Sequence, residues 1–189
     1  YEILGEIGRG GMGIVYKARQ QALGRIVALK VMIAGEHATL EALQRFLLEA
    51  RSAARIDHPN VVQVYEAGSE GAFHYFTMRY VEGVALSRLI REQPFPVPRA
   101  LQIARKVLLA LDAAHRQGVI HRDVKPGNIL IDGGGEPQVT DFGLAKDLAG
   151  ERLTAPGVAM GTPAYASPEQ VSGEMERVGQ PVSLRRSGR

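Results

Sequence analysis

The apolar residues of this chain change their spacing along the sequence, and this change constrains the fold more than any other feature. Residues 1–7, 14–19 and 26–33 are rich in β-branched side chains and are separated by glycine clusters, which is typical of short strands joined by tight turns. From residue 98 to residue 115, apolar residues recur at helical spacing instead. We therefore expect a β-rich antiparallel first part and a mainly helical second part.

One helix and two more strands are predicted between these parts. Apolar residues at steps of three and four over residues 40–54 form one stripe, so this helix would pack against the strands. The sequence His58-Pro59-Asn60 is expected to end it. Residues 61–67 and 74–80 are then predicted to be strands around a turn at residues 69–71.

The predicted long helix that begins near Pro98 has two apolar faces. One face carries Leu101 and Leu108, and the other carries Ile103 and Val107. A helix that is apolar on most of its circumference is expected to lie inside a helical lobe, not on its surface.

Composition excludes several classes of protein. Of 189 residues, 45% are apolar and 23% are charged, as in an ordinary globular protein. There is no cysteine, which excludes a disulfide framework and fits a reducing compartment. The net charge of +3 equals the three arginines of residues 179–189, so the rest is neutral and no nucleic-acid partner is expected. No apolar stretch approaches the length of a membrane span.

The sequence Gly8-Arg9-Gly10-Gly11-Met12-Gly13 has the spacing G-x-G-x-x-G. Glycines at these positions let backbone N–H groups approach phosphate oxygens closely. Dinucleotide-binding folds use the same spacing to open a helix, whereas residues 14–17 continue as a β-branched strand. A Walker A loop would need lysine where Ile14 stands. The motif predicts a glycine-rich hairpin over a phosphate, and a purely structural hairpin is the open alternative.

Lys30 follows Val27-Ala28-Leu29 in a predicted strand and shares a face with Ala28 and Met32. An ammonium group is costly there unless an anion meets it, and the candidate anions are a phosphate and Glu49. The alternatives left open are an edge-strand lysine that reaches water and a solvated Glu49 on the helix surface.

Two polar runs occur in the second part. His121-Arg122-Asp123-Val124-Lys125-Pro126-Gly127-Asn128 lies between the long helix and a predicted strand at residues 129–132. Asp141-Phe142-Gly143 follows the next predicted strand, residues 138–140. A loop without a function would carry one or two such residues by chance, but not both runs in this order.

In combination these motifs resemble the eukaryotic-like (Hanks-type) protein kinases, most closely bacterial serine/threonine kinases, from residue 1 to about residue 171. The resemblance implies an α+β, two-lobed protein-kinase-like fold. Residues 1–81 would form a five-stranded antiparallel N-lobe with one helix and the hinge, and residues 82–178 an incomplete, mainly helical C-lobe. The implied activity is ATP-dependent transfer of the γ-phosphoryl group to Ser/Thr hydroxyls of proteins, with Mg²⁺.

The resemblance also implies site residues. Lys30 would hold the α- and β-phosphates and be oriented by Glu49, while Asp123 would orient the substrate hydroxyl. His121 would pack in the core and not act as a base. Lys125 would meet the γ-phosphate, and Asn128 and Asp141 would hold Mg²⁺. The implied nucleotide-binding set is Gly8, Gly10 and Gly13 over the phosphates, Val15 and Ala28 by the adenine, Met78 as gatekeeper, and Arg79 to Val81 as the hinge.

Lys125-Pro126 and Gly161-Thr162 resemble the serine/threonine branch of the family. Arg122 beside Asp123 suggests control by activation-loop phosphorylation, with Thr154 as the first candidate site and Thr162 as the second. The resemblance leaves open a nucleotide-binding pseudokinase-type module or an inactive truncated fragment. The kinase region is expected to be cytoplasmic, and a membrane-anchored longer protein stays open.

The chain departs from the family after the activation segment. Ser167-Pro168-Glu169 replaces the usual Ala-Pro-Glu, and the helices that follow in the family are absent, so we expect Ile103, Val107 and Leu111 to lose packing partners. We hypothesise that residues 179–189 are an anomalous basic tail produced by a frameshift. A tail with a membrane or partner role is the alternative.

Overall fold

The computed structural model describes residues 1–10, 13–32, 39–92, 95–142 and 165. The chain forms two compact units, residues 1–147 and 148–189, and every described residue except Tyr165 belongs to the first.

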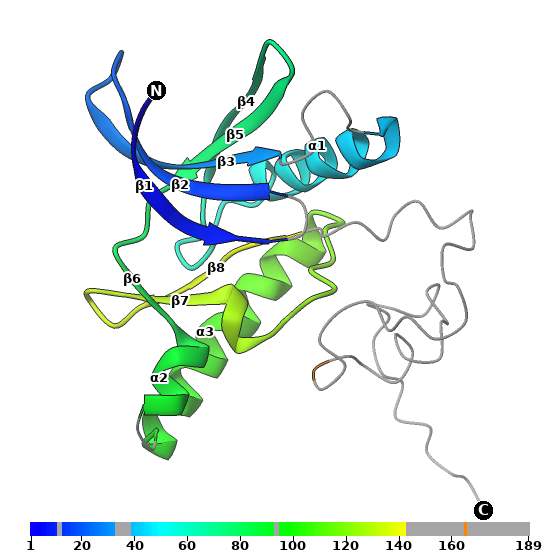
Figure 1. Cartoon of the computed structure of the whole chain (residues 1–189). Helices are drawn as coiled ribbons and strands as arrows, with labels where there is room; N and C mark the ends of the chain where they lie inside the picture. The colour runs from blue at the N-terminus through cyan, green and yellow to red at the C-terminus, as the bar shows by residue number, and fades with distance from the viewer. Residues whose placement is uncertain (11–12, 33–38, 93–94, 143–164, 166–189) are drawn as a thin grey trace, which may run out of the picture. The chain divides into compact units, whose positions relative to one another are not determined.

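The N-terminal sheet has five antiparallel strands, as predicted (Figure 1). Their order in the sheet is β1-β2-β3-β5-β4, which the sequence did not predict. β3 is the central strand, paired with β2 on one edge and β5 on the other, and side chains on both of its faces are buried: Val27 and Leu29 on one face, Ala28 and Lys30 on the other. The strands are β1 (Glu2–Arg9), β2 (Gly13–Gln20), β3 (Arg25–Met32), β4 (Val64–Glu70) and β5 (Phe73–Arg79).

The predicted single helix of this lobe is α1 (Leu40–Ala54). Its N-terminus is capped by Thr39, whose hydroxyl accepts the Ala42 N–H at 3.2 Å. Phe46 is completely buried, and its ring packs on Phe76 of β5 with the centroids 5.1 Å apart. The helix ends at Ala54, before the predicted stop at residues 58–60.

The strand predicted at residues 61–67 begins later, at Val64. Val61 and Val62 leave the sheet and lie beside Val139, to whose carbonyl the Val62 N–H donates at 2.9 Å. The predicted turn at residues 69–71 is wrong at its start, because β4 continues to Glu70 and the chain turns at Gly71 with φ +58°. The left-handed backbone at Gly71 suits a residue without a side chain.

The second part holds a small antiparallel sheet and two helices. The sheet has the order β6-β7-β8, and β6 was not predicted because three residues carry too little periodicity. The elements are β6 (Gly83–Ala85), α2 (Leu86–Glu92), α3 (Val97–Arg116), a 3₁₀ turn at Pro126–Asn128, β7 (Ile129–Asp132) and β8 (Pro137–Val139).

Helix α3 is buried along one stripe only, so the prediction that most of its circumference lies in the interior is wrong for the described part of the chain. Ile103 and Val107 are buried, at 5% and 6% exposure, while Leu101 and Leu108 are each 65% exposed. The expectation that Ile103, Val107 and Leu111 lose packing partners is wrong for Ile103 and Val107, which are buried, while Leu111 is only partly buried against the same cluster. Helical spacing locates both apolar stripes but cannot tell which of them meets the sheet.

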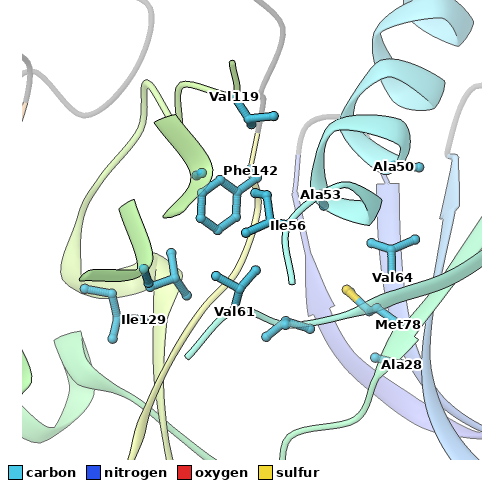
Figure 2. Close-up of a cluster of buried hydrophobic side chains, with 14 of the residues drawn as sticks. Ala28, Ala50, Ala53, Ile56, Val61, Val64, Met78, Val119, Ile129 and Phe142 are labelled. Atoms are coloured by element: carbon cyan, nitrogen blue, oxygen red, sulfur yellow. The ribbon is translucent and has the colours of Figure 1, made fainter. Parts of the chain in front are cut away.

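One hydrophobic cluster runs through both parts of the fold (Figure 2). It continues from Met78 and Val64 of the N-terminal sheet through Ile56 and Val61 to Phe142 of the second part. The residues that carry the candidate site are therefore positioned by a shared core.

Candidate active site

Lys30 and Glu49 form a buried ion pair between β3 and α1. Lys30 Nζ lies 2.5 Å from Glu49 Oε1 and 3.3 Å from an oxygen of Asp141, which follows β8. The side chains of Lys30 and Glu49 are only 8% and 3% exposed. This geometry excludes the alternatives of an edge-strand lysine and a solvated glutamate, because β3 is central and α1 turns Glu49 inward.

Burial and charge act in opposite directions on this pair. Burial lowers the pKa of Lys30, but the carboxylates of Asp141 and Glu49 outweigh burial and raise it overall, so the amine stays protonated. Burial raises the pKa of Glu49 to about 7 despite the attraction of Lys30. Glu49 Oε2 is buried without a hydrogen-bond partner among the described residues. Glu49 also lines a small cavity together with Met78 and Phe142.

In the polar run at residues 121–128, the side chains of Lys125 and Asn128 contact Asp123. Lys125 Nζ lies 2.7 Å from Asp123 Oδ2. Asn128 Nδ2 donates to the Asp123 carbonyl at 2.9 Å and to its Oδ2 at 3.0 Å. Lys125 and Asn128 thus both bind the same carboxylate oxygen of Asp123, which orients this side chain, and at 17% exposure it keeps access to solvent.

The backbone is unusual at Asp141 and at Arg122, the residue before Asp123. Arg122 has φ +63° and Asp141 has φ +59°, a left-handed region that residues other than glycine seldom adopt. Such strain persists only where surrounding contacts hold it, and it gathers at functional sites.

His121 supplies contacts that hold this backbone. Its Nδ1 accepts the Asp123 N–H at 3.3 Å, so Nε2 carries the proton of the neutral ring and donates to the Thr140 carbonyl at 3.0 Å. The ring is 1% exposed, lies 4.6 Å from the Phe142 ring, and burial lowers its pKa. His121 therefore joins the two polar runs as a neutral core residue, and Thr140 is a supporting residue that the sequence did not single out.

The glycine-rich segment closes the hairpin between β1 and β2. The Gly10 N–H donates to the Gly13 carbonyl at 2.9 Å. A side chain on Gly13 would place Cβ 2.6 Å from the Val31 carbonyl oxygen of β3, so packing alone requires glycine there. Gly8 and Gly10 have no such close neighbour, and the contact of all three with phosphate stays a prediction.

The residues predicted to surround adenine come together around the hinge. Ala28 and Met78 are directly paired across β3 and β5, and both are buried. Val15 and Val81 are partly buried against the same hydrophobic cluster. On the hinge, the Tyr80 ring lies under the Lys17 ammonium, 4.6 Å from its centroid.

The few protein oxygens available for a metal ion are suited to Mg²⁺ that is also bound by substrate phosphates. They are not suited to a metal ion bound by protein ligands alone. Asp141 supplies a carboxylate that is 31% exposed, and Asn128 supplies an amide oxygen. No group of three His, Cys, Asp or Glu side chains able to hold a metal occurs in the part of the chain that the structure describes. Mg²⁺ is commonly held by one or two protein oxygens together with substrate phosphates.

Comparison with known proteins agrees with this arrangement. Residues 1–183 match the protein kinase domain family, and the chain belongs to that family. The family resemblance drawn from the motifs is thereby confirmed.

Relatives with similar sequences are bacterial serine/threonine kinases. The chain is 42% identical over 174 residues to a probable serine/threonine-protein kinase of Clostridium perfringens, covering 92% of this chain and 25% of that protein. It is 41% identical to serine/threonine-protein kinase PrkC of Bacillus subtilis, covering 92% and 27%. For PknL of Mycobacterium tuberculosis the identity is 42%, covering 90% and 43%. The chain thus spans between a quarter and somewhat under half of these relatives.

Solved structures also resemble the fold. The PknI kinase domain of Mycobacterium tuberculosis matches with a TM-score of 0.65 and 31% identity, covering 76% of this chain and 59% of that one. The apo form of PpkA-294 matches with a TM-score of 0.67 and 27% identity, covering 75% and 58%. Among the helices that the structure describes, none has the length and apolar character needed to cross a membrane.

The structure brings together most of the predicted site. Lys30, Glu49 and Asp141 form one group, and Asp123, Lys125 and Asn128 form another. Gly143, Thr154, Thr162 and residues 167–169 and 179–189 lie outside the described residues. The frameshift hypothesis for the last segment therefore stays a prediction.

Proposed function

We propose that this chain binds ATP and transfers its γ-phosphoryl group to Ser/Thr hydroxyls of proteins. The observation that carries the proposal is the position of the Lys30 ammonium, buried between Glu49 of α1 and Asp141 after β8. A buried cation held by acids from separate elements is a ready partner for a triphosphate. The kinase domain family implies ATP use, and the similar bacterial relatives support Ser/Thr as the acceptor.

The proposed nucleotide lies under the glycine hairpin, with its α- and β-phosphates on Lys30. Ala28, Val15 and Met78 would contact the adenine, and the backbone of residues 79–81 would bond its polar edge. Asp141 and Asn128 would hold Mg²⁺, which neutralises phosphate charge when bound. Lys125, 2.7 Å from Asp123 in the structure, would meet the γ-phosphate.

In the proposed reaction the acceptor hydroxyl oxygen forms a bond to the γ-phosphorus, and the bond from that phosphorus to the β,γ-bridging oxygen breaks. ADP leaves with the bridging oxygen, and the hydroxyl proton passes to the Asp123 carboxylate. Lys125 supplies positive charge to the transferred group. Because the transition state is loose, these residues act by positioning and charge more than by covalent chemistry.

The proposal is tested by following phosphate from γ-labelled ATP onto a generic protein substrate. Asp123→Asn keeps an oxygen that can accept from Asn128 but removes the proton acceptor, so the transfer rate should fall about 10² to 10⁴-fold. Asp112→Asn is the matched control, since Asp112 pairs with Arg116 on the surface of α3 and should leave the rate unchanged. ATP binding without transfer in the unsubstituted chain would favour a pseudokinase-type module, and absence of both would contradict the proposal.

The finer parts of this function are proposals as well. Thr154 remains the first candidate and Thr162 the second for a phosphate that pairs with Arg122. We keep a cytoplasmic location for this domain because its phosphoryl donor is ATP.

A further inference from the structure

The side chain of Arg79 connects the hinge to the second sheet. Arg79 is the last residue of β5, and its backbone N–H donates to the Gln63 carbonyl at 2.8 Å. Its Nη2 donates to the Val61 carbonyl at 3.2 Å and also to Gln138 Oε1 of β8. One guanidinium thus bonds two segments that are distant in sequence from the hinge.

Gln138 is well suited to receive this bond. It is only 5% exposed, and its Nε2 donates to Asp132 Oδ2 at 3.2 Å. The amide therefore presents its oxygen to a donor and its nitrogen to an acceptor, which allows one orientation only. The result is a chain of hydrogen bonds from guanidinium to amide to carboxylate.

Asp132 is the last member of this series of hydrogen bonds, and its side chain is a carboxylate. The Glu136 N–H has the largest effect in lowering the pKa of Asp132, and Gln138 and Arg79 lower it further. Asp132 also accepts the Gly134 N–H at 2.9 Å, so its side chain is fixed within the turn between β7 and β8. The charge that attracts Arg79 is thus held by a rigid hairpin.

Hydrogen bonds join the two segments that the Arg79 side chain contacts, residues 60–62 and β8. The Val139 N–H donates to the Asn60 carbonyl at 2.8 Å, and the Val62 N–H donates to the Val139 carbonyl at 2.9 Å. Asn60 Nδ2 also donates to the Pro137 carbonyl at 2.8 Å. The segment at residues 60–62 and β8 therefore form one support, and the Arg79 side chain ties the hinge to it.

We infer that Arg79 is a positioning residue whose side chain fixes the hinge backbone for the adenine edge by anchoring it to Gln138 of β8. The inference rests on the proposed function, in which the backbone of residues 79–81 bonds adenine. Backbone groups that bind a ligand must be held to within about 0.5 Å of the productive geometry. Both bonds come from Nη2 of Arg79, so one donor group holds the Val61 carbonyl and Gln138 together.

The experiment is a double-mutant cycle with Arg79→Met and Gln138→Met in the full chain, read by calorimetric affinity for Mg-ATP and for Mg-tripolyphosphate. Each single variant should bind Mg-ATP roughly tenfold more weakly, as for loss of one hydrogen bond to a charged group. The double variant should be no weaker than Arg79→Met alone, because that substitution already removes the bond to Gln138. Affinity for tripolyphosphate, which lacks adenine, should stay unchanged.

Lys106→Met is the matched control, because Lys106 pairs with Glu136 in the same hairpin but does not contact the hinge. It should leave Mg-ATP affinity unchanged. Amide hydrogen exchange at residues 79–81 should become faster in Arg79→Met and not in Lys106→Met. If Arg79→Met does not fold, Gln138→Met carries the test alone.

Unchanged Mg-ATP affinity in a folded Arg79→Met or Gln138→Met protein would overturn the inference. So would an equal loss of ATP and tripolyphosphate affinity, since that is the result of a general structural defect. Failure of the unsubstituted chain to bind Mg-ATP would instead overturn the proposed function and this inference with it.

Discussion

The two groups of charged residues in the candidate site are built in different ways. On the N-terminal side, Lys30 and Glu49 are 8% and 3% exposed and are held by a central strand and a helix. On the loop side, Asp123 and Lys125 are 17% and 27% exposed and are held by side-chain bonds and an unusual backbone. The first group is part of the hydrophobic interior, and the second lies at its border.

This difference separates stability from chemistry. Burying an ion pair costs desolvation, so removing one member leaves an unmatched charge in the interior. A partly exposed pair is screened by water and contributes little to folding. Lys30 and Glu49 should therefore affect both folding and activity, whereas Asp123 should affect mainly activity.

The largest expected loss of stability comes from removing one member of the buried Lys30–Glu49 ion pair. Glu49→Leu should lower the free energy of unfolding by about 3 to 5 kcal/mol, because Lys30 loses its closer partner. Adding Lys30→Met to Glu49→Leu should recover part of that loss by replacing the pair with apolar side chains. Urea unfolding at neutral pH measures both.

Asp123→Asn is the control from the loop side and should change the free energy of unfolding by less than about 1 kcal/mol. Equal losses for Asp123→Asn and Glu49→Leu would show that the two groups do not differ in this way.

The next prediction concerns the buried face of helix α3 and its contribution to the free energy of unfolding. Ile103→Ala should lower the free energy of unfolding by about 2 to 5 kcal/mol, because it empties a buried position on α3. Leu108→Ala is the matched control on the same helix, and at 65% exposure it should change stability by less than about 0.5 kcal/mol. A larger loss from Leu108→Ala than from Ile103→Ala would mean that the other stripe of α3 is the buried one.

The smallest expected effect concerns His121. Its substitution should change how the free energy of unfolding depends on pH, and only below neutral pH. Burial lowers the pKa of His121 below its ordinary value of 6.5, so the unfolded chain takes up a proton that the folded chain resists. The stability due to this residue is thus complete above about pH 6.5 and is lost as the pH falls toward the lower folded-state pKa. His121→Gln should flatten this acid slope in unfolding experiments, while His115→Gln, at an exposed position, should not. An unchanged slope in His121→Gln would contradict a buried neutral His121.

Sequence reasoning was most successful where chemistry is local. The glycine hairpin was distinguished from other phosphate loops by the strand that follows it, and the five strands and their helix were predicted in the correct order. The buried environment of Lys30 was expected from alternation along its strand, but an edge position could not be excluded, because strand order depends on pairing between distant segments.

The errors share one cause. The sequence offers two apolar stripes on α3, and only contact with the rest of the core decides that Ile103 is inside and Leu108 outside. Residues 61 and 62 have strand-forming side chains, yet they pair with Val139 and not with the N-terminal sheet. The Arg79 side chain left no local signal, since Gln138 is 59 positions away.

The amino-acid sequence by itself determined the family, the residue types at the site and most of the regular elements, because these depend on spacing between near neighbours. The tertiary structure decided which helix face is buried, which strand is central and which side chain supports the hinge. These outcomes depend on contacts between segments far apart in the chain, whose free energy is set by the packing of the whole core and not by any one of them.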